Sequence, residues 1–105
     1  MNSFKIEPEV GMGATVIMWS DRHAYTIVSV SLDKKKISIQ KDTVISIGNN
    51  GPGFSQEYEY FPNLNGNIIF ASLRKDGSYV VVGESLKNGT RIGIGYRREF
   101  YDYSF

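Results

Sequence analysis

The sequence predicts an all-β protein, a small antiparallel barrel or sandwich of six to seven short strands. Short runs of β-branched and aromatic residues alternate with polar residues, as strands with one buried face do. Gly, Asn and Asp interrupt these runs about every eight to twelve residues, which is typical of tight turns. No segment shows the apolar period of an amphipathic helix. We therefore expect a single β-barrel-like domain over residues 1–105.

The first three predicted strands cover residues 15–19, 24–31 and 36–41. In the second strand, Tyr25 and Val30 fit an inner face with either Ile27 or Val28 between them, so its register stays open. The third strand alternates Ile with polar residues and has a clear inner face. Polar turns are expected between these strands, at residues 21–23 and 32–35.

The middle of the chain contains the longest run of strand breakers, at residues 48–53. Residues 43–47, before it, either extend the third strand or form a new one. Alternation resumes at 56–61, with two tyrosines on one face and two glutamates, Glu57 and Glu59, on the other.

Three further strands are expected at residues 68–74, 79–82 and 91–96. The Asp76-Gly77 pair between the first two predicts a type I′ hairpin turn, and Asn88-Gly89 predicts another turn. Gly93 and Gly95 share one strand face. Either an aromatic ring or a partner can approach the backbone closely there, or the two glycines mark a bend in a curved strand.

Composition limits the possible functions. Lys and Arg number 12 against 11 Asp and Glu, so a net charge of +1 argues against a strongly basic nucleic-acid-binding domain. Without Cys the chain has no disulfide, thiolate nucleophile or cysteine-ligated zinc. We expect no signal peptide, no membrane span, no cofactor and a cytoplasmic location.

Two segments combine aromatic and charged residues. In the first, His23 follows Asp21 and Arg22. His23 could act as a general base or as a single metal ligand, or it could simply belong to a polar turn. The second runs from residue 96 to 105, where an arginine pair stands among tyrosines and phenylalanines. Such a segment suits a bound nucleotide, a protein interface or a terminal strand packed on the core.

The glycine pairs at 11–13 and 93–95 do not continue into a phosphate-binding loop, and two carboxylates on one strand face are more typical of a solvated surface than of a site. We predict no catalytic residue and no metal ligand. The candidate ligand-binding residues are Trp19, Arg22, His23, Arg97, Arg98 and Tyr101. We expect Arg97→Ala and Arg98→Ala to impair binding without unfolding the protein.

Three stretches form a pattern that spans nearly the whole chain. They are a Ser-Asp-Arg segment before a Tyr-Thr-Ile strand (20–27), a Gln-x-Tyr segment (56–58) and a closing stretch that ends in Tyr101-Asp102. In these the chain resembles small proteins of tailed bacteriophages and prophages. The resemblance implies action in the cytoplasm of an infected bacterium rather than in virion assembly.

The resemblance favours a phage-encoded, non-catalytic binding protein that antagonises a bacterial defence system. Its partner would be a nucleotide signal, sequestered by a homo-oligomer, or a host defence protein bound directly. One alternative is a small-barrel nucleic-acid-binding protein that uses Arg22 and the lysines at 34–36. Another is a metal-assisted hydrolase that uses His23 with Asp21 or Glu57.

Overall fold

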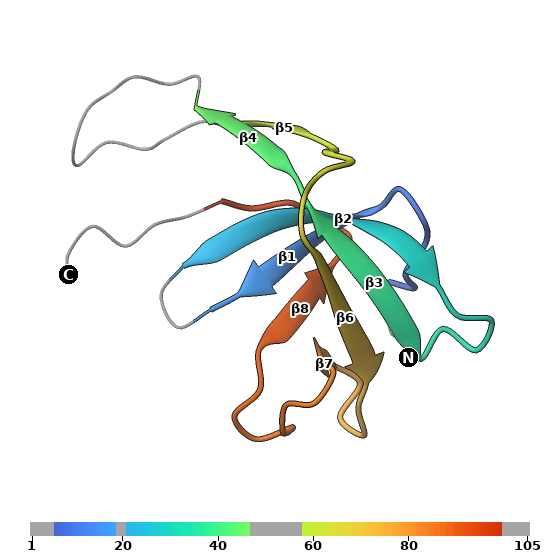
Figure 1. Cartoon of the computed structure of the whole chain (residues 1–105). Coiled ribbons are helices and arrows are strands. Elements are labelled where there is room, and N and C mark those ends of the chain that lie inside the picture. The colour runs from blue at the N-terminus through green and yellow to red at the C-terminus, as the bar shows by residue number, and fades with distance from the viewer. Residues whose placement is uncertain (1–5, 19–20, 47–57, 100–105) are drawn as a thin grey trace.

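The computed structural model describes residues 6–18, 21–46 and 58–99, which form strands and no helix (Figure 1). The strands are β1 (Gly13–Ile17), β2 (Arg22–Val30), β3 (Lys36–Lys41), β4 (Thr43–Ser46), β5 (Tyr58–Phe61), β6 (Ile68–Leu73), β7 (Tyr79–Val81) and β8 (Arg91–Ile94). Six of them close into an antiparallel barrel in the order β1-β2-β3-β6-β7-β8. The predicted all-β class is confirmed, and the architecture is the barrel.

Pairing of the first and last strands closes the barrel. Thr15 of β1 lies opposite Gly93 of β8 on one side and Ala24 of β2 on the other. Alternate residues of each barrel strand point inward, as the period-2 pattern predicts. The inward side chains form one apolar core, made of Ala14, Val16, Tyr25, Ile27, Ile37, Ile39, Ala71, Tyr79 and Ile92.

A β-bulge in β2 explains why the sequence did not decide which residues of this strand face the core. The register with β3 shifts between Ile27 and Ser29, so Val28 is the extra residue. Because one residue is inserted, Tyr25 and Ile27 face the core before the bulge, and Val30 packs against the core after it. A strict alternation along the strand could not place Tyr25, Ile27 and Val30 on the same face.

The strands β4 and β5 form a separate two-stranded sheet. They continue the β3–β6 pairing beyond the barrel, so β3–β4 and β5–β6 make one long hairpin whose far half projects from the barrel (Figure 1). Residues 62–67 are inserted on one side of this hairpin, against only Asp42 on the other. That unequal insertion breaks the ladder and separates the projecting hairpin from the barrel.

Three local predictions need correction. Arg22 and His23 were expected in a turn, but they pair with β1, and the chain turns earlier, where the Met18 N–H donates to the Asp21 carbonyl at 3.0 Å. The last strand ends at Ile94, because Gly95 has a φ of +95° and turns the chain.

The third correction concerns the β6–β7 turn. The Gly77 N–H donates to the Arg74 carbonyl at 3.0 Å, and of these turn residues only Gly77 has a positive φ, +88°. A type I′ turn needs two such residues, so this is a type I turn followed by a glycine bulge. The carboxylate of Asp76 accepts the Ser78 N–H at 2.9 Å, which supports that geometry.

Candidate functional site

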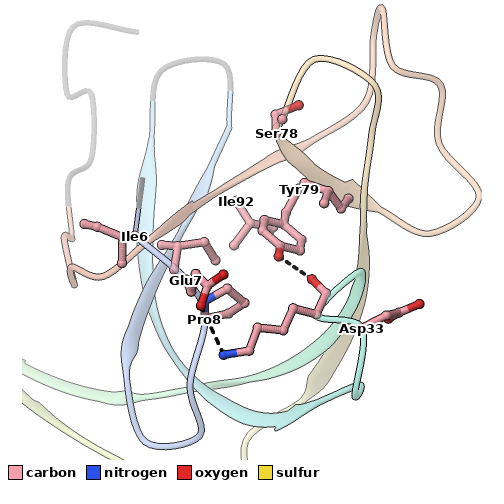
Figure 2. Close-up of a pocket in the computed structure, with 11 residues that line it drawn as sticks. Ile6, Glu7, Pro8, Asp33, Ser78, Tyr79 and Ile92 are labelled. Atoms are coloured by element: carbon pink, nitrogen blue, oxygen red, sulfur yellow. Dashed lines mark hydrogen bonds and ion pairs between the residues drawn. The ribbon is translucent and has the colours of Figure 1, made fainter. Parts of the chain in front are cut away.

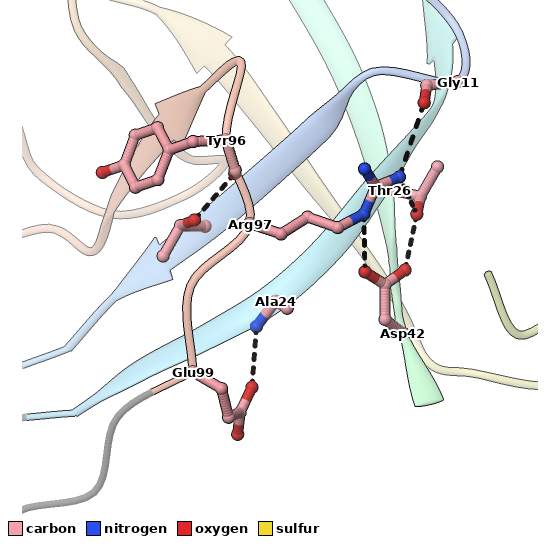
Figure 3. Close-up of polar contacts among 8 residues, drawn as sticks. Gly11, Ala24, Thr26, Asp42, Tyr96, Arg97 and Glu99 are labelled. Carbon is pink, nitrogen blue, oxygen red and sulfur yellow. Dashed lines mark hydrogen bonds and ion pairs between the residues drawn. The ribbon is translucent and has the colours of Figure 1, made fainter. Parts of the chain in front are cut away.

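The structure places four of the six predicted ligand-binding residues. Arg22 and His23 lie at the start of β2, and Arg97 and Arg98 lie in the segment that follows β8. Trp19 and Tyr101 lie outside the described residues. The four described residues belong to one side of the barrel, because residues 96–99 cross the outer face of β1 and β2 (Figure 3). We call residues 96–99 the C-terminal strap.

Small residues line the outer face beneath the strap. Gly93, Thr15 and Ala24 form one row across β8, β1 and β2, and the Asp42 N–H extends the row by donating to the Ala24 carbonyl at 3.1 Å. Thr15 and Ala24 are completely buried although they point away from the core. Their burial shows that the strap acts as a second packing layer over these strands.

The tyrosine that begins the strap explains the glycine at position 93 of β8. A Cβ at Gly93 would lie 2.2 Å from the Tyr96 hydroxyl oxygen, so the ring occupies the space that a side chain would need. The Thr15 hydroxyl donates to the Tyr96 carbonyl at 2.8 Å and holds the same residue from beneath. Close approach of an aromatic ring to bare backbone was one of the two predicted roles of this face, and the ring belongs to the chain itself.

The side chain of Arg97 extends across the outer face of the barrel and forms its hydrogen bonds with side chains of the protein itself. Its Nε donates to Asp42 Oδ2 at 2.9 Å and its Nη2 donates to Thr26 Oγ1 at 2.9 Å, while the Thr26 hydroxyl donates to Asp42 Oδ1 at 2.5 Å (Figure 3). The Asp42 side chain is fully buried and that of Arg97 is 27% exposed. Arg97 is therefore the counter-ion of a buried carboxylate.

The other end of the strap is held through Glu99. One carboxylate oxygen accepts the Ala24 N–H at 2.9 Å, and the other lies 3.1 Å from His23 Nδ1. The Glu99 side chain is fully buried, and that of His23 is 20% exposed. The histidine thus pairs with a carboxylate from the far end of the chain, which the sequence hypothesis based on Asp21 or Glu57 did not contain.

The two remaining arginines differ. Arg22 Nη1 donates to the Met18 carbonyl at 3.0 Å and to the Asp21 carbonyl at 2.9 Å, so it fastens the β1–β2 connection. Arg98 is exposed on the strap. Of the described candidates, Arg98 alone presents an exposed cation, and Arg22, His23 and Arg97 contact other parts of the chain.

A cavity that the sequence did not indicate opens at one end of the barrel. It measures about 390 Å³ and is lined by Ile6, Glu7, Pro8, Asp33, Lys34, Leu73, Gly77, Ser78, Tyr79, Ile92 and Ile94. Its walls are mainly apolar, and polar groups stand at its rim (Figure 2). We call it the barrel-mouth pocket.

Polar contacts at this pocket converge on Lys34. The Tyr79 hydroxyl donates to the Lys34 carbonyl at 2.5 Å, and Lys34 Nζ lies 3.4 Å from Glu7 Oε2 (Figure 2). Burial raises the pKa of Tyr79 above its usual 10.0, and the nearby carboxylates of Glu7 and Asp33 add to that effect. Hydrogen bonds from Ser31 and Lys35 lower the pKa of Asp33, which keeps this carboxyl ionised.

An exposed apolar surface lies on the outside of β6 and of the residue that follows β7. We define the outer apolar patch as Ile68, Phe70 and Val82, which are 49%, 62% and 54% exposed. The Val82 N–H donates to the Phe70 carbonyl at 2.9 Å, so the two side chains lie side by side across the strands. A sequence signal existed, because in 68–74 the apolar residues occupy both strand faces and only one face can enter the core.

No group of three or more His, Cys, Asp or Glu side chains that could hold a metal ion occurs among residues 6–18, 21–46 and 58–99. Within those same ranges no helix is long and apolar enough to cross a membrane. Comparison of the chain with models of protein families, with curated proteins and with solved structures finds no match.

Proposed function

We propose that this chain is a non-catalytic binding protein that antagonises a defence system in the cytoplasm of an infected bacterium, and that it does so by binding a host protein through the outer apolar patch. The observation that favours a protein partner is Phe70, which is 62% exposed on the outside of the barrel, between the exposed Ile68 and Val82. The phage context comes from the resemblance described above.

The patch has the composition of an interface centre. Aromatic and aliphatic side chains that lie together on a rigid surface form the anchors of protein interfaces, and a few of them supply most of the binding free energy. The backbone of Phe70 is held in the barrel on both sides, opposite Ser38 of β3 and bonded to Val82. Such a surface binds with little loss of conformational entropy.

A host-protein partner is favoured over a sequestered nucleotide. A nucleotide site needs cationic side chains that are free to reach phosphate. Arg97 instead neutralises buried Asp42, and Arg22 donates to backbone carbonyls. The arginine-based nucleotide hypothesis would therefore depend on Arg98 and on residues outside the described ranges.

The test compares Phe70→Ser with Leu32→Ser, a control that removes an equally apolar and fully exposed side chain from the β2–β3 turn. Tagged wild-type protein and both variants are incubated with lysate of defence-active bacterial cells, and the captured protein is purified and titrated directly. We expect Leu32→Ser to bind like the wild type and Phe70→Ser to bind at least about 30-fold more weakly, the effect of losing an interface hot spot.

Three results would overturn the proposal. Equal affinity of the wild type and Phe70→Ser would show that the patch is not the interface. A dimer of the purified chain that Phe70→Ser dissociates would assign the patch to self-association. A nucleotide bound to the purified protein in native mass spectrometry, with no protein partner, would favour sequestration.

A further inference from the structure

The barrel-mouth pocket is a second candidate binding site, and it is independent of the outer apolar patch. Leu73, Ile92 and Ile94 line it from the barrel, and Ile6 and Pro8 line it from the N-terminal segment. Its volume of about 390 Å³ falls within the range of small-molecule sites, roughly 300–1,000 Å³. An apolar chamber of this size suits the hydrocarbon part of a small ligand.

The single cation at the rim occupies an unusual backbone position. Lys34 has a φ of +61°, and it is the only residue other than glycine with a positive φ among those described. The Lys34 N–H closes the turn between β2 and β3 by donating to the Ser31 carbonyl at 2.9 Å, and the chain needs its left-handed residue at Lys34 to return into β3. Gly or Asn would meet that need with less strain.

Lysine at this position is therefore better explained by its side chain than by its backbone. Lys35 and Lys36 supply charge to the same turn without a positive φ and do not line the pocket. Lys34 does line it, and its carbonyl accepts the hydroxyl of Tyr79, a residue of the barrel core. The turn thus holds one ammonium group at the opening of an apolar chamber.

The contact with Glu7 shows that the Lys34 ammonium group binds a carboxylate. Its carboxylate lies 3.4 Å from Lys34 Nζ, while its side chain is 70% exposed. An ion pair this exposed contributes little to stability, so an incoming anion can replace Glu7 at low cost. Asp33, the other carboxylate at the rim, points away from Tyr79 and Glu7 in Figure 2 and accepts the Lys35 N–H at 3.0 Å.

We propose that the barrel-mouth pocket binds a small amphipathic carboxylate, with its carboxylate on Lys34 Nζ in place of Glu7 and its hydrocarbon chain against Leu73, Ile92 and Ile94. The pocket supplies one cation and apolar walls, which matches one anionic group on an apolar body. In the unliganded chain, Glu7 is the internal stand-in for that carboxylate.

The probe is decanoate, titrated into isotope-labelled protein and followed by the methyl resonances of leucine and isoleucine. Three variants are compared: Lys34→Met, Glu7→Gln and the matched control Lys35→Met. We expect decanoate to shift the Leu73, Ile92 and Ile94 methyl signals. Lys34→Met should weaken binding about tenfold, as expected for loss of a charge-assisted hydrogen bond. Lys35→Met should bind within about twofold of the wild type, and Glu7→Gln should bind more tightly because Lys34 loses its competitor.

A second comparison needs no variant and so does not depend on how any variant folds. Decanoate, decanol and decylamine share one hydrocarbon chain and differ in charge. The proposal requires decanoate to bind the wild type most tightly. It is overturned if decylamine binds as tightly as decanoate, if Lys34→Met and Lys35→Met bind equally, or if decanoate leaves the three methyl signals in place.

Discussion

Replacing Arg97 by Ala removes the counter-ion of a fully buried carboxylate, so we expect it to destabilise the protein strongly. In the variant Asp42 loses its hydrogen bond from Arg97 Nε, and Thr26 loses its bond from Arg97 Nη2. The Thr26 hydroxyl remains as a neutral partner of Asp42. Truncating one member of a buried ion pair costs about 3–5 kcal/mol.

The expected loss lies at the lower end of that range. The Arg97 side chain is 27% exposed, so water partly replaces the lost guanidinium in the variant. We expect a loss of about 3 kcal/mol in the free energy of unfolding. For a domain of 105 residues this corresponds to a fall in melting temperature of roughly 12–24 °C.

The assay is urea unfolding followed by circular dichroism, with Arg98→Ala as the matched control. Arg98 is the exposed neighbour on the same strap, so its truncation should change the free energy of unfolding by no more than about 0.5 kcal/mol. The reasoning is refuted if Arg97→Ala costs less than about 1 kcal/mol, or if the two variants are equally stable. This prediction differs from the expectation based on the sequence, in which both arginines could be replaced without unfolding the protein.

Two further predictions concern stability. Gly66→Ala should cost about 1–3 kcal/mol in urea unfolding, because a Cβ there would lie 2.2 Å from the Lys41 backbone carbonyl oxygen, which cannot rotate away; a wild-type midpoint in that variant would contradict the packing described for the hairpin junction. Tyr79→Phe should change how stability depends on alkaline pH, because burial raises the pKa of Tyr79 in the folded state above 10.0. The contribution of this hydroxyl is complete below pH 10.0 and is lost as the pH rises through the higher folded pKa, so the stability gap between wild type and variant should narrow as the pH rises from 10.0 to the folded pKa. A gap that widens there would contradict the direction given for this pKa.

The strands were predictable because their information is local. Alternation of Ile with polar residues defines β3, and the Asp76-Gly77 pair ends β6 in a hairpin. Where a local rule admits more than one geometry, the prediction was incomplete. The bulge at Val28 and the turn type at Gly77 depend on the register that the neighbouring strands impose.

The site depended on contacts between residues that are far apart in the chain. Arg97 and Asp42 are separated by 55 positions, and Glu99 and Ala24 by 75. No spacing rule connects such pairs, because barrel closure brings them together. The sequence showed an arginine pair among aromatic residues, and only the closed barrel showed that one arginine is buried against a carboxylate while its neighbour is exposed.

By itself, the sequence determined the all-β fold class and the absence of cysteine chemistry, since composition and short-range alternation decide these properties. The tertiary structure decided which faces are covered. The strap buries Thr15 and Ala24 on the outside of the barrel and does not cover Phe70. The turn between β2 and β3 sets Lys34 at the mouth of a cavity. The physical reason is that the burial of a strand face depends on the element that packs against it, and the strand's own residues do not identify that element.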